Sequence, residues 1–491
     1  MLLSLLFVPS ANSGGMGIIM KHKKLAILLI SLALTCPLPV FAGTGTSMSS
    51  AVNIVSADDR SLTPWTTLDR ALDEMVDTPG AYQVPGLGVI LYKDGREVYS
   101  HFAGSRYLDE STGKKLPVTR DTKFRIASVS KQFTVFTLMQ LAEKGKLNLK
   151  DDVSKYLGFT LRNPAYPDVP ITLEMLASHT SSLRNAGNYN ALPQETLKEF
   201  FLPGGRYWED GAHFAPRGQA PGEYFCYSDL NYGVLGTVIE VVTGKRFDHY
   251  QQKHILKELS TSAGYVPANF SRKQQKKLGA IYRRLNAQGK IDEKAPWHST
   301  IDDYSHGVPD RETNFFNEKF HNIKGYKPGR NATIFSPQGG LRISCEELSH
   351  ALEMLMNGGK FRGKQILSPE STAEILRPHW SYDPDKDNGD TYVGTMLSYG
   401  LGEYQVYGNS TGRVCRDYEI DLVGHTGEAY GLLSGIFFRP GTRDGFVYVI
   451  NGLPLELDVD PRTAGQFSGC YIWEERIMNA ICNALWGANK R

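Results

Sequence analysis

The segment that most constrains the fold is a helix predicted from Ser128 to Lys144, which Gly145 ends. Its side chains are apolar on almost every face, and a helix of that kind is stable only when other elements surround it. Ser128 and Lys131 stand one turn apart at its start, so both side chains lie on the same face. The chain is therefore predicted to fold around this helix. The apolar residues are Val129, Phe133, Val135, Phe136, Leu138, Met139, Leu141 and Ala142.

The serine and lysine of this helix suit nucleophilic catalysis. Burial lowers the pKa of a lysine, and a neutral amine can take the proton of a neighbouring serine hydroxyl. Free N–H groups at a helix start can stabilise an oxyanion. Taken alone, the pair also fits a helix cap, Ser128 or Ser130, with Lys131 extending to solvent. Two further segments favour the catalytic interpretation.

The first of these segments ends in a turn before an apolar helix predicted from Leu230 to Val242. Tyr227 lies in that turn. A phenol beside a cationic lysine has its phenolate favoured, so Tyr227 is predicted to shuttle protons. Asp229 is predicted to cap the helix and also to line the site. A core tyrosine remains the alternative for Tyr227.

The second segment reads His425-Thr426-Gly427-Glu428 and stands just before a strand predicted from Gly431 to Phe438. Glycine there lets the backbone approach a substrate, and an edge strand can pair with an extended amide. Taken alone, His425 would be interpreted as a turn histidine. This segment is therefore interpreted as part of a catalytic site only because the other two segments accompany it.

Strand patterns occur near both ends of the chain, and helical patterns lie between them. They predict a mixed α/β (α+β) fold, in which N- and C-terminal strands form one antiparallel sheet flanked by helices. The sheet lobe is expected over about 65–120 and 340–491, with an inserted, mostly helical lobe over about 121–339. The irregular stretches 184–222 and 285–335 are expected to be substrate-facing loops. The other predicted elements are helices at 66–76 and 471–486 and strands at 87–92, 97–102, 397–406 and 446–450.

In this order, the three segments resemble the motifs of the serine β-lactamase and penicillin-binding protein superfamily. The nearest resemblance is to its class C β-lactamase-related branch, which includes DD-peptidases, D-aminopeptidases and esterases. The similarity covers about residues 65 to 455 and includes the stretches 173–183, 336–342 and 399–402. It implies a β-lactamase/transpeptidase-like fold, no cofactor, and a structural role for His179.

The resemblance also implies a role for each motif residue. Ser128 would be the acylated nucleophile, and Lys131 and Tyr227 would share the general-base and general-acid work. His425 would lie opposite them, near the substrate carboxylate or the tyrosine. The backbone N–H groups of Ser128 and Glu428 would form the oxyanion hole.

The chain departs from the class C pattern at two motif positions. Asp229 stands where these β-lactamases usually have asparagine, and His425 stands where they have lysine. Both changes remove donors or positive charge, so they favour the esterase and peptidase members. Thr426 and Gly427 are predicted to contact substrate. Glu428 stands where related proteins often have glycine, and it is expected to disfavour anionic substrates or to select cationic ones.

The N-terminus predicts export. A basic start at residues 20–24 precedes an apolar run at 25–34 and small residues up to Ala42, as in a signal peptide with an upstream extension. Cleavage is expected after Ala42, followed by a leader over 43–64 and a single catalytic domain over 65–491. The protein is thus predicted to be periplasmic or secreted without a stable membrane anchor. An uncleaved anchor is the alternative.

Charge and metal-ligand patterns exclude several classes of protein. The formal net charge is +2 and no basic stripe stands out, which argues against nucleic-acid binding. The 12 histidines form no zinc-binding pattern, which argues against a metallohydrolase. A bridge between Cys415 and Cys470 is expected among the cysteines that remain after cleavage. The sequence does not indicate an oligomeric state.

The predicted function is an exported serine hydrolase that forms an acyl-enzyme on Ser128. Its partner would be a small-molecule or peptide substrate, either an ester or a D-amino-acid amide, and the site leaves room for weak β-lactamase activity. The alternative is a catalytically idle penicillin-binding or sensor protein with the same fold. A catalytically idle protein has no chemical need for Ser128, Lys131 and Tyr227 together, so their presence argues against that alternative.

Overall fold

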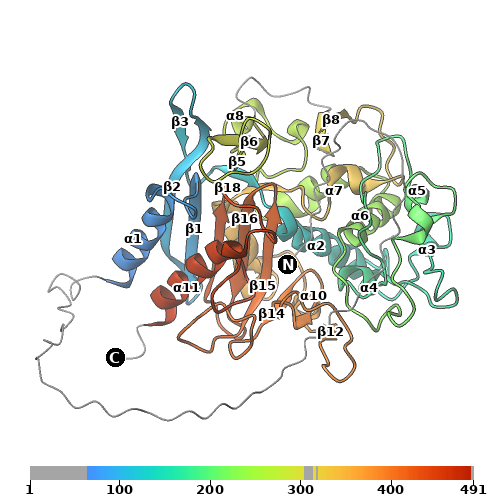
Figure 1. Cartoon of the computed structure of the whole chain (residues 1–491). Coiled ribbons are helices and arrows are strands. Elements are labelled where there is room, and N and C mark those ends of the chain that lie inside the picture. The colour runs from blue at the N-terminus through green and yellow to red at the C-terminus, as the bar shows by residue number, and fades with distance from the viewer. Residues whose placement is uncertain (1–62, 304–312, 317–318, 488–491) are drawn as a thin grey trace, which may run out of the picture. The chain divides into compact units, whose positions relative to one another are not determined.

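A nine-stranded antiparallel sheet organises the computed structural model, which describes residues 63–303, 313–316 and 319–487 (Figure 1). Its spatial order is β12-β13-β14-β15-β16-β17-β1-β2-β3, so strands from the two ends of the described chain meet where β1 pairs with β17. The predicted fold class is confirmed. The strands are β1 Gly86–Lys93, β2 Arg96–Asp109, β3 Lys114–Pro117, β12 Trp380–Ser381, β13 Ser398–Tyr399, β14 Tyr404–Val406, β15 Leu422–Ala429, β16 Leu432–Phe438 and β17 Gly445–Ile450.

The central strands bury side chains on both faces of the sheet. Val89 and Leu91 of β1 pack in one core with helices α1 (Pro64–Asp77) and α11 (Ile472–Trp486). Ile90 points to the other face and packs in a second core with α2 (Ser130–Glu143) and α9 (Cys345–Met356). Alternation along a strand sends neighbours to opposite faces. Because both faces are covered, these strands are apolar at nearly every position.

The helix that the sequence places at the centre of the fold is buried as predicted. It begins with a 3-10 turn, η2 (Ala127–Val129), and continues as α2, whose residues 130–141 are buried. Helix α6 (Asp229–Thr243) packs beside it and ends at Gly244, which adopts φ +65°. The structure thus sets α2 between α6 and the sheet (Figure 1).

The remaining elements are short and surround α2 and the sheet edges. The segment predicted as a helical lobe also contains strands, because β5 and β6 form a small sheet with β18. The helices are α3 Ser154–Leu157, α4 Leu173–Ala177, α5 Lys198–Phe201, α7 Phe247–Gln251, α8 Arg272–Gln275 and α10 Pro369–Leu376. The strands are β4 Lys123–Arg125, β5 Ile281–Arg284, β6 Trp297–Ile301, β7 Thr313–Phe316, β8 Lys319–Asn322, β9 Arg342–Ser344, β10 Lys360–Phe361, β11 Lys364–Gln365 and β18 Gly452–Leu453.

Three sequence predictions of local structure were wrong. The strand predicted at 397–406 is two short strands, because the chain reverses at Gly402, which adopts φ +73°. The stretches 184–222 and 285–335 are not irregular throughout, since the first contains α5 and the second contains β6 to β8. His425 lies within strand β15 and not in a turn. Gly424 and Gly427 interrupt the apolar pattern of this strand, which pairs with β14 on one side and with β16, the strand that follows it directly, on the other.

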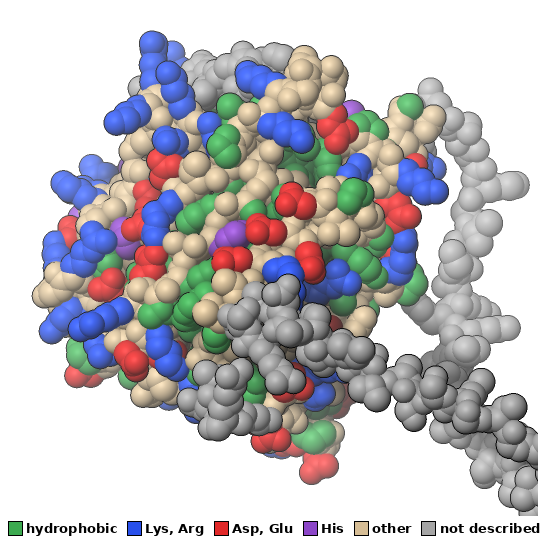
Figure 2. Space-filling view, turned by 90° about the vertical axis from the view of Figure 1, so that its left-hand side faces the viewer, with side chains coloured by type: hydrophobic (Ala, Val, Ile, Leu, Met, Phe, Trp, Pro, Cys, Tyr) green, Lys and Arg blue, Asp and Glu red, His purple; other side chains and the backbone are tan. Residues whose placement is uncertain are grey.

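The predicted signal peptide with its cleavage point after Ala42 and nearly all of the predicted leader lie outside the described residues. Among the residues that the structure does describe, no helix combines the length and apolar character needed to cross a membrane. On the face shown in Figure 2, basic and acidic side chains are interspersed.

The predicted bridge between Cys415 and Cys470 was wrong, because Cys415 forms a disulfide with Cys482. Helix α11 brings Cys482 against the loop that carries Cys415, and the neighbouring Arg416 N–H donates to Asn479 Oδ1 of the same helix. Cys470 is a buried free thiol. Spacing along the chain could not reveal this pairing, because it depends on how α11 docks.

We expect Cys482→Ser to lower the unfolding temperature. The bridge joins residues 67 apart, and closing a loop of that length stabilises a fold by about 4 kcal/mol through the entropy of the unfolded chain. Thermal unfolding followed by circular dichroism measures the change, and Cys470→Ser is the control. A disulfide that survives in Cys482→Ser and disappears in Cys470→Ser, as read by intact mass, would contradict the observed pairing.

Candidate active site

Ser128 lies in the tight turn that leads into α2 and is 5% exposed. The preceding residue, Ala127, adopts φ +47°, a left-handed conformation that is uncommon for residues with a side chain. Such backbone strain persists only where the surroundings enforce it, and it is frequent at functional sites. The Ser128 hydroxyl oxygen accepts a hydrogen bond from Lys131 Nζ at 3.0 Å.

Lys131 is completely buried, and its ammonium group has three acceptors. Nζ donates to Asp229 Oδ1 at 2.7 Å, to Ser128 Oγ at 3.0 Å and to the Gln338 carbonyl oxygen at 3.2 Å. An ammonium group has three N–H donors, so all of them are used. Burial lowers the Lys131 pKa, while the Asp229 carboxylate opposes that shift. The resting Lys131 is therefore a cation paired with Asp229, and its burial makes loss of a proton easier.

Asp229 has a different role from the predicted helix cap. It is the first residue of α6, and the cap position belongs to Ser228, whose side chain makes no capping bond. The Asp229 carboxylate instead pairs with Lys131, and its side chain is 14% exposed. A buried ammonium needs a counter-ion more than a helix end needs a cap, because an unpaired buried charge is far more costly.

Tyr227 is brought to the same place, beside Ser128 and Lys131. Lys131 Nζ lies over its ring, 4.6 Å from the ring centre. Burial raises the Tyr227 pKa well above its usual value, the Asp229 charge raises it further, and a hydrogen bond with Ser128 lowers it. The expectation that the lysine would favour the phenolate was wrong for this resting state, because burial and then the Asp229 charge both favour the neutral phenol. Tyr227 is a neutral phenol here.

His425 lies on the far side of Tyr227, within strand β15. Its Nε2 is 3.5 Å from the Tyr227 hydroxyl oxygen and 3.0 Å from that of Tyr399. Its Nδ1 faces the carbonyl oxygen of Thr426. A carbonyl can only accept, so we place the ring proton on Nδ1, which leaves Nε2 to accept from a tyrosine hydroxyl. Burial and then Lys131 lower the His425 pKa to about 3, so the ring is neutral.

Aromatic residues outside the eight predicted site residues hold Tyr227 in place. His179, which was expected to be structural, stacks on the Tyr227 ring with centres 4.2 Å apart. Its Nδ1 accepts from the Ser228 backbone N–H. The Tyr392 hydroxyl oxygen accepts from the Tyr227 backbone N–H at 3.1 Å. Tyr399 lies in a stretch that resembles the family, which was the only sequence signal for it.

The third motif forms an edge beside Ser128. Strand β14 pairs with residues 422–424 only, so beyond Gly424 that side of β15 is not paired with β14. Gly427 packs directly against the turn that holds the serine. A side-chain carbon at Gly427 would overlap the Ile126 carbonyl oxygen and lie 3.1 Å from the Ser128 backbone nitrogen. Only glycine lets the strand come this close.

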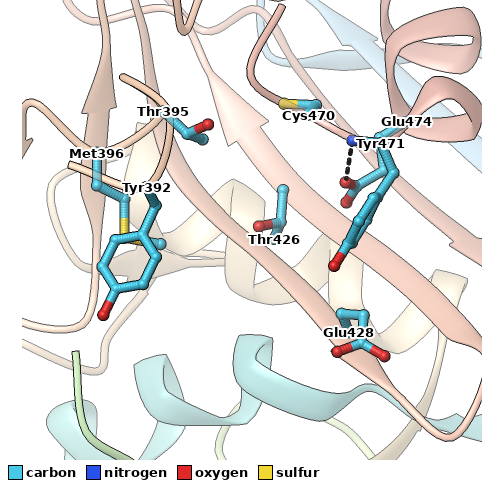
Figure 3. Close-up of a pocket in the computed structure, with 8 residues that line it drawn as sticks. All are labelled: Tyr392, Thr395, Met396, Thr426, Glu428, Cys470, Tyr471 and Glu474. Carbon is cyan, nitrogen blue, oxygen red and sulfur yellow. Dashed lines mark hydrogen bonds between the residues drawn. The ribbon is translucent and has the colours of Figure 1, made fainter. Parts of the chain in front are cut away.

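Thr426 and Glu428 project from β15 into a pocket next to this edge (Figure 3). Thr426 Oγ1 accepts a hydrogen bond from the Tyr404 hydroxyl at 3.3 Å. The Glu428 side chain is 12% exposed and lies 3.8 Å from the Arg283 guanidinium. Burial raises the Glu428 pKa to about 7, although Arg283 lowers it. The structure therefore brings all eight predicted site residues to one region.

A separate cluster has the geometry to hold a metal ion. Among the described residues, Glu174, Glu374 and His379 place ligand atoms within 4.8 Å of one another. None of the predicted site residues belongs to this cluster.

Comparison with known proteins gives a family-level match over most of the chain. The model of the family described as Beta-lactamase matches residues 68–468. Protein flp of Staphylococcus aureus (strain MW2) is 30% identical over 180 residues, a match that covers 36% of this chain and 34% of flp. This chain therefore spans about a third of the length of that curated relative.

Solved structures share the fold. A β-lactamase/D-alanine carboxypeptidase from Yersinia pestis has a TM-score of 0.56 and is 17% identical, covering 86% of this chain and 98% of that one. A D-amino acid amidase from Ochrobactrum anthropi SV3 has a TM-score of 0.55 and is 17% identical, covering 86% of this chain and 99% of that one. At these identities the likeness shows the fold alone.

We expect Gly427→Ala to slow reaction at Ser128 by on the order of tenfold or more, because the added methyl group would push β15 away from the serine turn. The rate of fluorophosphonate labelling of Ser128 measures the effect. Gly339→Ala is the matched control, since its methyl group would meet Ala127 at ordinary distances of 3.7 to 3.8 Å. Equal labelling rates in the two variants would contradict the close fit at Gly427.

We expect Asp229→Asn to move the acidic limb of the pH–rate profile to lower pH. The Asp229 carboxylate raises the Lys131 pKa and burial lowers it, so removing the charge leaves the lowering to act alone. More of the lysine is then neutral at a given pH and able to accept a proton. The pH dependence of Ser128 labelling measures the shift. An unchanged limb would show that Lys131 is not the titrating base, and Asp390→Asn is the control.

Proposed function

Because the chain belongs to the β-lactamase family, we propose that it is an exported serine hydrolase that forms an acyl-enzyme on Ser128. The family membership and the fold support a hydrolase of the β-lactamase type. The observation that carries the proposal is the contact of Lys131 Nζ with Ser128 Oγ at 3.0 Å, in a buried setting where Asp229 supplies the counter-ion.

The contacts suggest how the proton of the serine moves. Lys131 donates to the Ser128 oxygen, so the hydroxyl hydrogen of Ser128 is free to point towards Tyr227. In the reactive state Lys131 is neutral and accepts the serine proton, directly or through Tyr227, while the serine oxygen forms a bond with the substrate carbonyl carbon. The proton then passes to the departing alcohol or amine. Water then breaks the acyl–serine bond and releases the acid. Burial of Lys131 favours its neutral form, which can activate that water.

The charge state of the site favours esters and D-amino-acid amides or peptides over β-lactams. Lys131 is paired with Asp229, and His425 is neutral, so neither offers a free positive charge to a substrate carboxylate. This leaves room for only weak β-lactamase activity. The name of the Ochrobactrum anthropi relative, a D-amino acid amidase, lends support to amide substrates.

Export is supported by two features of the chain. The residues up to Ala42 have the pattern of a cleavable signal peptide. The disulfide between Cys415 and Cys482 fits an oxidising compartment, because such bonds are rare where thiols are kept reduced. Both features support a periplasmic or secreted location.

A penicillin-binding or sensor protein is the second candidate, and one observation favours it. All three Lys131 donors are satisfied and the Tyr227 pKa is raised well above its usual value, so neither group is a ready base in the resting site. Slow deacylation would then leave a lasting acyl group on Ser128. Such a protein would report a bound acyl donor and would not turn it over.

Intact-protein mass spectrometry separates these functions. The purified chain is incubated with a fluorophosphonate and, in a second sample, with a penicillin, and Ser128→Ala is treated in parallel. We expect one fluorophosphonate adduct that is absent from Ser128→Ala. A lasting penicillin adduct would favour the peptidase or sensor over a β-lactamase. No adduct with either probe, on folded protein, would overturn the acyl-enzyme proposal.

A further inference from the structure

The pocket beside the free edge of β15 contains two polar groups without hydrogen-bond partners. Residue Thr395 is 4% exposed, and its hydroxyl oxygen has no hydrogen-bond partner within the described residues. Figure 3 shows it directed into the space between its loop and β15. The Glu428 carboxyl, 12% exposed, likewise accepts no hydrogen bond in the described part of the chain. We call this space the β15 pocket.

The Thr395 hydroxyl oxygen is buried without a partner, and such a group destabilises a fold unless a ligand supplies the missing hydrogen bond. The nearest cation to Glu428, Arg283, stands 3.8 Å away and donates its own hydrogen bond to the Leu455 carbonyl oxygen. Arg283 therefore attracts Glu428 without satisfying its oxygens. A ligand that donates hydrogen bonds would satisfy Glu428 and Thr395 together.

The charge of the pocket selects the sign of such a ligand. Glu474, at the start of α11, lines the same pocket and is 2% exposed. Its oxygens already accept from the Tyr448 hydroxyl and from the Tyr471 backbone N–H. Burial raises the Glu474 pKa to about 8, so near neutral pH Glu474 is mostly protonated and leaves the donors of a ligand to Glu428. The Glu428 carboxylate is therefore the group in this pocket that repels an anion and attracts a cation.

The position of the pocket connects it with the catalytic serine. Along β15, His425 contacts Tyr227 and Gly427 packs against the Ser128 turn. Thr426 and Glu428 alternate with them, so their side chains point to the other face, where α11 begins. A substrate that lies along the edge of β15 can reach both faces. Its cation would then be held away from the like charge of Lys131.

We propose that the β15 pocket binds the protonated primary amine of a substrate whose scissile carbonyl group lies at Ser128. Glu428 is the counter-ion, and the Thr395 hydroxyl oxygen accepts a further hydrogen bond. This proposal rests on the proposed hydrolase function and narrows its substrates to esters and amides that carry an amine. A compact ammonium group with three donors matches a carboxylate and a hydroxyl oxygen.

The proposal carries a pH dependence. The Glu428 pKa is raised to about 7 by burial first, lowered by Arg283 and raised again by Asp458 and Asp229. Glu474, with a pKa of about 8, and Tyr471 also face Glu428. Below pH 7 Glu428 is mostly protonated and supplies no counter-ion. Affinity for an amine is therefore expected to rise as the pH rises through about 7.

A pair of chromogenic substrates tests the pocket. D-phenylalanine p-nitroanilide carries the free amine, and its N-acetyl derivative has the same leaving group without the charge. The measured quantity is the ratio of kcat/KM for the amine to kcat/KM for the acetylated form. We expect Glu428→Gln to lower this ratio by on the order of tenfold, the effect of one charge-assisted hydrogen bond. Thr395→Val is expected to lower it a few-fold, and the exposed Glu370→Gln to leave it unchanged.

Calorimetry with benzylamine separates failure of this proposal from failure of the hydrolase proposal. It measures binding to the full chain and requires no turnover. If neither anilide is hydrolysed and Ser128 is not labelled, the hydrolase proposal fails, but benzylamine affinity that falls in Glu428→Gln still supports the pocket. Equal benzylamine affinity in the native chain and Glu428→Gln, or an unchanged substrate ratio in that variant, overturns the amine proposal.

Discussion

The structure depends on burying one ammonium group. Lys131 has no contact with solvent, so every one of its three donors must find an acceptor within the protein. The acceptors come from three places along the chain, at Ser128, Asp229 and Gln338. Satisfying one cation therefore joins the start of α2, the start of α6 and the loop before β9. The same contacts that make burial tolerable also assemble the nucleophile and its neighbours.

The backbone of the sheet packs closely against the cluster around Lys131. Gly427 on β15 packs against the turn that holds Ser128, and the Ser434 hydroxyl of β16 donates to the Ile126 carbonyl oxygen in that turn. These contacts support Ala127 in its left-handed conformation. Two cores, one on each face of the sheet, then fix β15 and β16. The strained turn that holds Ser128 thus packs against the buried centre of the sheet.

The electrostatic balance of the site is close to neutral, and this shapes its chemistry. Asp229 cancels Lys131, His425 is deprotonated, and Tyr227 is held as a phenol. Neutral ester and amide groups enter such a site without meeting a charge of either sign. Charge recognition is displaced to the other face of β15, where Glu428 stands. In the proposed function, catalysis and selection of the substrate would thereby use alternate residues of one strand.

Local patterns were sufficient to predict the buried helix with Ser128 and Lys131, and the strands β1, β2, β16 and β17 of the sheet, because periodicity and short spacings follow from neighbouring residues alone. The sequence also determined which eight residues meet at the site, through the resemblance of three motifs. Only the tertiary structure decided that Asp229 pairs with the lysine, that His425 is neutral and that Cys415 bonds to Cys482. Each of these depends on burial and on contacts between residues far apart in the chain, which no local pattern records.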